Sequence, residues 1–138
     1  MKIFGLVFLF LLVAFVSRIF FYEYEKEAKP IFYKDIIQVD SPLSDSVVKS
    51  PLKIIGSARG AWYFEASFPV RIFDSNGKEL GVIPAQAKGD WMTTDFVPFE
   101  ATLVFQIPTT ETGTLVLEKD NPSGLPENSD SVSIPVRF

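Results

Sequence analysis

Turn-forming residues punctuate the chain from residue 41 onward, and their spacing constrains the fold more than any other feature. Clusters of Gly, Pro, Asn, Asp and Ser recur at short intervals, often about eight to twelve residues, which is typical of an all-β sandwich or barrel. The short apolar runs between them show no helical period of useful length. The clusters are Ser41-Pro42, Ser50-Pro51, Ser75-Asn76-Gly77, Lys88-Gly89-Asp90, Pro108 to Gly113 and Asn121-Pro122-Ser123-Gly124.

The apolar runs predict about seven strands. The last run is the clearest, because apolar residues alternate with Ser, Pro or Arg, which buries one face and leaves the other in water. Pro135 donates no ladder hydrogen bond, so this strand is expected at a sheet edge, or unpaired on that side. In an earlier strand, Leu103, Phe105 and Ile107 are expected on one face. The predicted strands are Ile36–Val39, Leu52–Ser57, Phe68–Asp74, Leu80–Ala87, Phe99–Ile107, Thr114–Lys119 and Val132–Phe138.

The cluster at residues 75–77 allows two registers for its hairpin. A two-residue loop would pair Ile72 with Gly81, whereas a three-residue loop pairs Ile72 with Leu80 and brings Val82 to the same face. The second register places apolar residues of both strands together, so we expect it.

The N-terminal stretch from Ile3 to Tyr22 is apolar except for Ser17 and Arg18. As a helix, about 20 residues span roughly 30 Å, the thickness of a bilayer core. We therefore expect residues 1–22 to form one transmembrane anchor. The alternative is a cleaved signal peptide, but the run lacks small residues at both positions that a cleavage site needs. A buried core helix is disfavoured because the run is apolar on all sides.

Charge predicts how this anchor is oriented. Lys2 and the α-amino group precede the run and three glutamates follow it, so the positive-inside rule keeps the N-terminus in the cytoplasm. We expect a charged stalk over residues 23–34 and an extracytoplasmic domain over residues 35–138. A stalk this short limits the domain to partners within a few tens of ångströms of the cell membrane.

Composition excludes several classes of function. The chain has no Cys and no His, which removes disulfides, thiolate metal sites and the commonest metal ligand. We therefore predict no cofactor and no metal. Without Lys2 and Arg18 of the apolar stretch, the 13 basic residues fall to 11 against 17 acidic ones, a net charge of −6. An acidic domain repels phosphate backbones, so no nucleic-acid partner is expected.

The densest aromatic stretch covers residues 56–69. It suggests a binding platform in which Trp62 or Tyr63 stacks on a ligand while Arg59 and Glu65 hydrogen-bond it. The alternative is a core tryptophan beside an Arg59–Glu65 ion pair, since a buried glutamate needs a partner. Three successive aromatic residues cannot all face one side of a strand, so at least one is expected at the surface or under a loop.

A second candidate site lies around Asp90 and Trp91. A tryptophan followed by Met92 within a polar loop could form an exposed apolar patch that binds a partner. The alternative is a loop that caps an open end of the sandwich.

A third candidate contains Asp120 and Asn121, in a proline-stiffened loop with the chemistry of Asx turns. Together with Glu127, their oxygens could bind Ca²⁺. The spacing of an EF-hand loop is missing, so the alternative is a purely structural turn.

Catalytic sequence patterns are mostly absent. The chain has no nucleophile elbow, no P-loop and no dinucleotide fingerprint, and a serine nucleophile would lack a histidine base. What remains is a carboxylate pair for glycoside cleavage, Glu65 with Asp90 or Asp95. Such pairs arise by chance in an acidic domain, so we expect no enzymatic activity.

Several segments, in order, resemble the second GerM-associated domain, an immunoglobulin-like domain of bacterial spore-germination and sporulation-related proteins. The resemblance implies an immunoglobulin-like β-sandwich, a bacterial source and a location in the cell envelope, with no catalytic residues to carry over. It raises a role in sporulation or germination, although we expect no GerM domain, which accompanies this domain elsewhere, beside it in these 138 residues. The segments are Gly56–Pro69, Gly89–Met92, Phe96–Phe99, Asp120–Gly124 and Ile134–Phe138, within roughly residues 36–138.

These observations lead to one expected function and two rivals. We expect a membrane-anchored, non-catalytic immunoglobulin-like module of the bacterial envelope that binds a membrane-proximal protein or cell-wall glycan through its aromatic loops. One rival is a carboxylate-based hydrolase acting on cell-wall glycan. The other is a structural spacer or assembly subunit.

Overall fold

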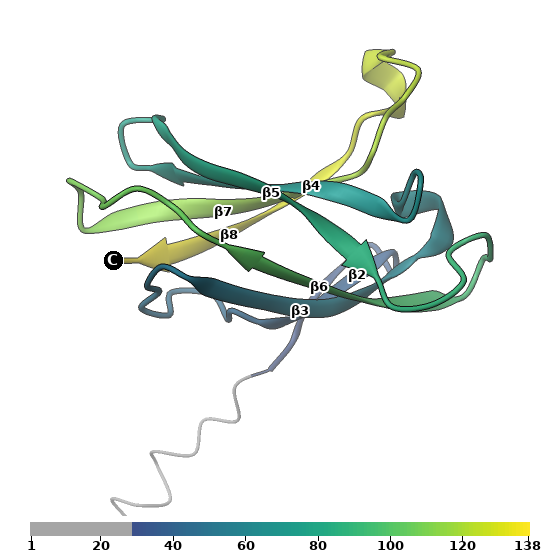
Figure 1. The fold of residues 1–138 in the computed structure, drawn as a ribbon, viewed down its shortest axis with the longest axis horizontal. Helices are drawn as coiled ribbons and strands as arrows, with labels where there is room; N and C mark the ends of the chain where they lie inside the picture. The colour runs from purple at the N-terminus through teal and green to yellow at the C-terminus, as the bar shows by residue number, and fades with distance from the viewer. Residues whose placement is uncertain (1–28) are drawn as a thin grey trace, which may run out of the picture.

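The computed structural model describes residues 29–138, and this part of the chain forms eight β-strands in one antiparallel sheet that folds over into two facing layers (Figure 1). The strands are β1 (Ile31–Tyr33), β2 (Ile37–Ser41), β3 (Leu52–Arg59), β4 (Ser67–Asp74), β5 (Glu79–Ala87), β6 (Phe96–Leu103), β7 (Thr112–Glu118) and β8 (Ser131–Arg137). Two short 3₁₀ helices lie in connections, η1 (Gly60–Trp62) and η2 (Pro126–Asn128).

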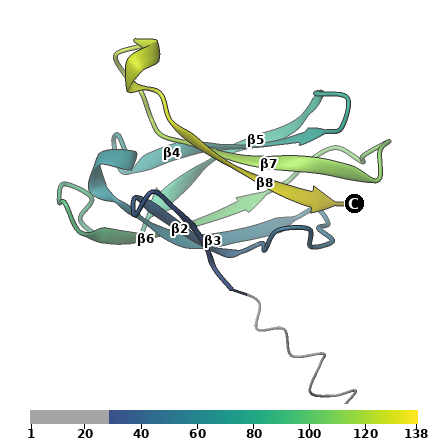
Figure 2. The same ribbon diagram turned by 180° about the vertical axis from the view of Figure 1, so that it is seen from behind.

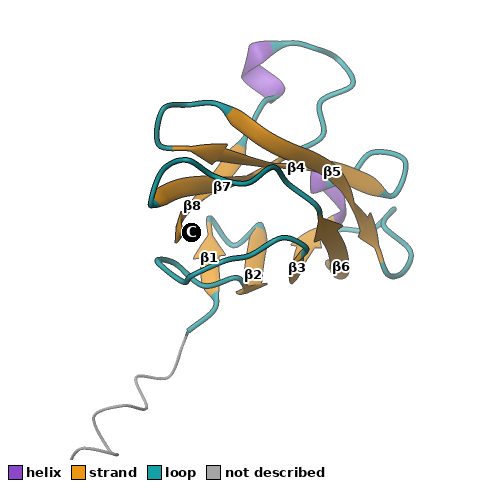
Figure 3. Cartoon of the chain, turned by 60° about the vertical axis from the view of Figure 1, so that its left-hand side comes forward, coloured by secondary structure: helices purple, strands orange, loops and turns teal. Residues whose placement is uncertain are grey.

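The strand order identifies the architecture. One layer contains β1, β2, β3 and β6, and the other contains β5, β4, β7 and β8 (Figure 3). The layers are joined where β5 pairs with β6 over two residue pairs, Gln86–Glu100 and Ala87–Phe99. From β2 onward, the strands follow the immunoglobulin arrangement of A, B and E in one sheet and C, F and G in the other. The predicted all-β, immunoglobulin-like fold is confirmed.

Strand β1 was not predicted, and it raises the strand number from about seven to eight. It pairs with β2 through Ile31–Val39 and Tyr33–Ile37. A tight turn joins the two strands, with Lys34 at φ 49°. These residues were expected in the charged stalk, because a three-residue strand beside charged residues has no periodicity to detect. Residues 31–33 of the predicted stalk are therefore part of the sheet.

The core lies between the layers and is built from the alternating strand residues. In β8, Val132, Ile134 and Val136 are buried while the residues between them are exposed, as predicted. The largest buried side chains are Trp62, Phe68 and Phe99, with Phe68 edge-to-face on Phe99 at a centroid distance of 4.9 Å. This aromatic group fills the end of the core nearest η1.

The β4–β5 hairpin combines the expected loop with an unexpected register. The loop is the three-residue one, since the Asp74 amide donates to the Lys78 carbonyl and Gly77 has φ 79°. A β-bulge follows, so Ile72 pairs with Gly81 instead of Leu80. The predicted register is therefore wrong beyond the bulge: Leu80 stays buried, but Val82 turns outward and is 47% exposed. The bulge adds one residue to β5 and reverses the faces after it.

Strand β6 also differs from its prediction. It begins at Phe96, three residues early, and ends at Leu103. Phe105 is buried, but Ile107 is 91% exposed and does not share its face. The chain beyond Leu103 crosses toward β5, where the Gln106 amide donates to the Leu80 carbonyl at 3.0 Å. This crossing ends the alternation that the sequence pattern predicted.

The predicted edge position of β8 is confirmed, since β8 is the last strand of the sheet. Its outer side is covered by a short segment that pairs with it in parallel, at Val47–Arg137. The Pro135 carbonyl accepts a hydrogen bond from the Asp45 amide at 2.8 Å. Proline can occupy this position because its carbonyl accepts a hydrogen bond there and no N–H donor is needed.

The predicted anchor (residues 1–22) and the first part of the predicted stalk (residues 23–28) lie outside the described residues. Within residues 29–138, no helix is long and apolar enough to cross a bilayer.

Candidate binding site at the loop end

Four connections meet at one end of the sandwich, which we call the loop end: residues 34–36, 60–66, 88–95 and 119–130. They include the connections that correspond to the B–C and F–G loops of immunoglobulin domains, which carry the binding surface in antibody variable domains. Residues 119–130 project from the body of the sandwich and carry η2 (Figure 2). All eight candidate residues from the sequence lie at or beside this end.

Trp62 and Tyr63 belong to the core. Trp62 is 0% exposed and meets Phe68 edge-to-face at a centroid distance of 6.4 Å. Tyr63 is also buried, its hydroxyl donates to the Val97 carbonyl at 2.6 Å, and burial raises its pKa. Side chains without exposed surface cannot stack on a ligand, so the platform interpretation fails for both residues. Phe64 is the aromatic residue that faces outward, as the sequence argument required of one of the three.

Arg59 does not pair with Glu65. Its guanidinium forms an ion pair with the Asp35 carboxylate at 2.7 Å and also donates to the Asp35 and Thr94 carbonyls. It also lies over the Phe96 ring, 4.4 Å from the centroid. Glu65 is exposed in a tight turn at φ 49°, so it needs no buried partner. Arg59 therefore fastens the residue 34–36 turn to the 88–95 loop.

Asp130 is the centre of a second cluster, which the sequence did not reveal. Its carboxylate accepts hydrogen bonds from the Tyr33 hydroxyl at 3.0 Å and from the Ser131 amide, and it pairs with the Lys34 ammonium at 3.3 Å. Burial raises the pKa of the Asp130 carboxyl, but these hydrogen bonds outweigh burial and leave the pKa lowered. No local pattern could join Tyr33 to a residue almost a hundred positions away.

A cleft of about 660 Å³ lies beside this cluster, between the body of the sandwich and the projecting loop. Candidates Asp120 and Asn121 line it, so the structure brings these two into a common hollow. The sequence missed the other groups of the cleft, which come from β1, β4, β7, β8 and the rest of the projecting loop. The polar and aromatic lining consists of Tyr33, Glu118, Lys119, Asp120, Asn121, Ser129, Asp130 and Ser131.

The projecting loop is held by its own hydrogen bonds. The Asn121 side-chain amide donates to the Leu125 carbonyl at 2.8 Å and to the Ser129 hydroxyl at 2.9 Å. Its oxygen accepts from the Ser123 hydroxyl, which in turn accepts from the Asn128 amide. The loop is therefore shaped before any ligand arrives, which lowers the entropic cost of binding.

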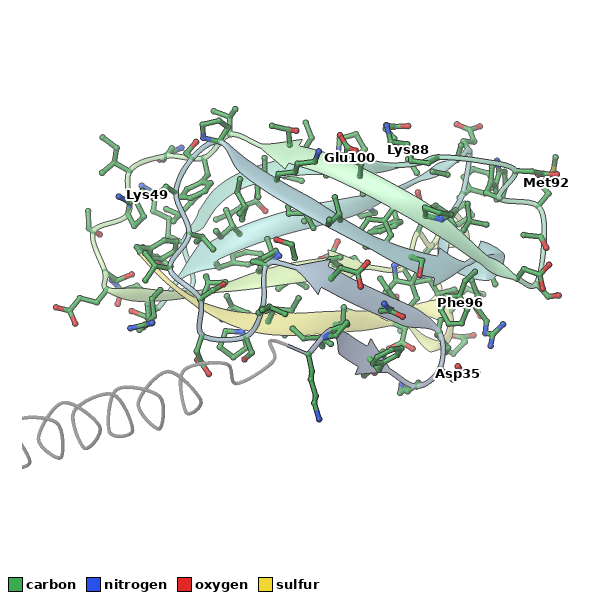
Figure 4. The ribbon with its side chains drawn as sticks, turned by 90° about the horizontal axis from the view of Figure 1, so that it is seen from below. Asp35, Lys49, Lys88, Met92, Phe96 and Glu100 are labelled. Atoms are coloured by element: carbon green, nitrogen blue, oxygen red, sulfur yellow. The ribbon has the colours of Figure 1, made fainter. Side chains whose placement is uncertain are left out.

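An exposed apolar surface forms at the tip of the 60–66 and 88–95 connections. We call Phe64, Trp91 and Met92 the apolar loop patch. The Phe64 and Trp91 rings meet at a centroid distance of 6.5 Å, and Met92 is 77% exposed. Figure 4 shows Met92 projecting at the end of the domain opposite Lys49. Asp90 caps the turn by accepting the Met92 amide at 3.0 Å.

Residues 29–138 contain no group of three or more His, Cys, Asp or Glu side chains placed to hold a metal ion. The Asn121 side chain, a predicted Ca²⁺ ligand, is engaged within its own loop. Glu65, Asp90 and Asp95, the predicted carboxylates for glycoside cleavage, are all exposed.

Comparison with known proteins gives one match. A protein-family model described as an immunoglobulin-like domain of bacterial spore germination matches residues 36–125, about two thirds of the chain. No curated protein and no solved structure matches the chain. The matched region includes residues 60–66, residues 88–95 and the first half of the projecting loop.

Proposed function

Because the chain belongs to the immunoglobulin-like domain family of bacterial spore germination, we propose that it is a non-catalytic binding module of the bacterial cell envelope. The resemblance inferred from the sequence is the same family. A role near germination or sporulation follows from that membership as part of the proposal. What the family leaves open is the ligand, and the loop end supplies the argument for it.

The observation that carries the proposal is the preformed cleft beside the projecting loop. Carboxylate groups lining it, among them Asp120 and Asp130, can accept hydrogen bonds from the hydroxyl and acetamido N–H groups of a sugar. The Tyr33 ring offers an apolar surface within the same cleft. The lining carries three carboxylates, Glu118, Asp120 and Asp130, against one ammonium, that of Lys119, and this excess of negative charge disfavours anionic ligands. We therefore assign cell-wall glycan as the ligand of the cleft.

The location of the module is part of the same proposal. Residues 1–22 serve as a single transmembrane helix with the N-terminus in the cytoplasm, and the domain lies outside the cell membrane. Because β1 begins at Ile31, the connection from residue 23 to residue 30 spans at most about 28 Å when fully extended. The glycan bound would be the wall layer nearest to the membrane.

Calorimetric titration of the full-length protein in detergent micelles with soluble muropeptides and glycan fragments tests this function. We expect saturable binding that Asp120→Ala weakens about tenfold, the loss expected for one charge-assisted hydrogen bond. Glu111→Ala, an exposed glutamate at the opposite end of the domain, is the matched control and should change nothing.

Two results would contradict the proposal. If the unmodified protein does not bind glycan, the function assigned to the cleft is wrong. If the protein releases shortened glycan during the titration, and Glu65→Gln abolishes that release, the protein is a hydrolase and the proposed non-catalytic function is wrong.

A further inference from the structure

The apolar loop patch shares no residue with the lining of the cleft, so it offers a second surface with its own chemistry. Met92 is 77% exposed, and Phe64, which packs against the Trp91 ring, is 41% exposed. We propose that this patch docks another envelope protein, through an apolar segment of that protein flanked by Lys or Arg residues. This proposal does not depend on glycan binding in the cleft.

The charges around the patch indicate the sign of the partner. Glu65 follows Phe64, Asp90 precedes Trp91, and Asp95 lies in the same connection; all three side chains are exposed. None of the six ion pairs found within residues 29–138 involves these carboxylates. The nearby Lys88 ammonium points to Glu100, 3.8 Å away, and the two are adjacent in Figure 4. The patch is therefore an apolar centre with an acidic rim.

This rim decides between the possible occupants. A bilayer surface rich in anionic lipids would repel three carboxylates, because membrane-surface recognition relies on Lys and Arg. A second copy of the chain would place the same acidic rim against itself in a two-fold contact. A protein segment with an apolar side chain between basic residues fits both the apolar centre and the acidic rim. Opposite charges across such a contact also steer and orient the encounter.

The patch is also preorganised. Gly60 lies so close to the 88–95 connection that a Cβ atom there would come within 2.0 Å of the Thr93 carbonyl oxygen and 2.2 Å of the Trp91 carbonyl oxygen. The turn after Phe64 is closed by reciprocal backbone hydrogen bonds between Phe64 and Ser67. Two loops held in this way lose little freedom on binding, so modest contact area gives useful affinity.

Site-specific photo-crosslinking tests the proposal in membranes of cells producing the full-length chain. The probe is p-benzoylphenylalanine in place of Met92, and the control is the same probe in place of Val104, which is 71% exposed at the opposite end. We expect protein adducts at position 92 and few at position 104. Sequencing of the adduct should show an apolar residue flanked by Lys or Arg.

A charge-neutral variant completes the test. Glu65→Gln, Asp90→Asn and Asp95→Asn combined keep the shapes of the side chains, including an acceptor for the Met92 amide, and should reduce the adduct yield at least threefold. The proposal is overturned if the yield is unchanged, if the adducts are lipid or a second copy of this chain, if the captured segment is acidic, or if position 92 gives no protein adduct.

Discussion

The segments around Trp62 and Trp91 look alike in the sequence, yet one became core and the other surface. Trp62 follows a strand end through η1, which turns the chain inward so that the indole packs against Phe68. Trp91 lies in a connection with no helical turn, and its ring rests between the core and the exposed Phe64. The comparison shows that aromatic content does not identify a binding surface, because the path of the backbone decides which rings reach solvent.

Gly60 joins the two segments. Its missing side chain allows η1 to lie directly against the carbonyl groups of Trp91 and Thr93. Arg59 adds a second fastening through the Thr94 carbonyl and the Phe96 ring. The buried segment therefore fixes the position of the exposed loop. Substitutions in the buried segment should also alter the conformation of the exposed loop.

Replacing each tryptophan by alanine should give the largest difference in stability between the two segments. We expect Trp62→Ala to lower the free energy of unfolding by about 3–5 kcal/mol, the range for deleting a large aromatic side chain from a core. Trp91→Ala should cost about 1 kcal/mol or less, because its side chain is already partly in solvent. Urea unfolding of the full-length chain in micelles measures both, and equal losses would contradict the assignment of Trp62 to the core.

Trp62→Phe sharpens that result. The Trp62 indole N–H has no hydrogen-bond partner within residues 29–138, so phenylalanine removes volume without removing a hydrogen bond. We expect a clearly smaller loss than for alanine. A loss as large as that of Trp62→Ala would indicate a hydrogen bond to the indole in solution.

Gly60→Ala tests the junction between the segments. The added methyl group meets two backbone carbonyl oxygens, which cannot rotate away, so we expect a loss of about 1–3 kcal/mol in the free energy of unfolding. Gly89→Ala is the matched control, because a Cβ there has nothing within 4 Å and should change stability by less than about 0.5 kcal/mol. Equal effects of the two variants would show that the loops are not in contact.

The smallest effect is expected at Asp130, outside both aromatic segments. Its pKa in the folded protein lies below the ordinary value of 3.8. The stability it contributes is therefore present above pH 3.8 and is lost as the pH falls through the lowered pKa. We expect up to about 1 kcal/mol, the usual size for a partly exposed pair. Unfolding at pH 5 and pH 2.5 should show this difference, and Asp130→Asn should remove it; an unchanged pH response in the variant would assign the acid sensitivity elsewhere.

The sequence determined the class of fold and much of its detail. Alternation in β8, the edge position of Pro135 and the three-residue loop at Gly77 all follow from residues that are near neighbours in the chain. The family resemblance and the requirement that one of three successive aromatic residues face outward also came from the sequence. These properties are local, since side-chain period and turn chemistry act over a few residues.

The tertiary structure alone decided which residues distant in the chain contact one another. The bulge at Leu80, the strand β1 and the pairing of Arg59 with Asp35 depend on segments that meet only after folding. The same is true of the cleft, where Asp120 and Asn121 were anticipated but Tyr33 and Asp130 were not. A sequence pattern records which face of a strand is apolar, whereas the choice of a contact across the sheet is made by the packing of the whole core.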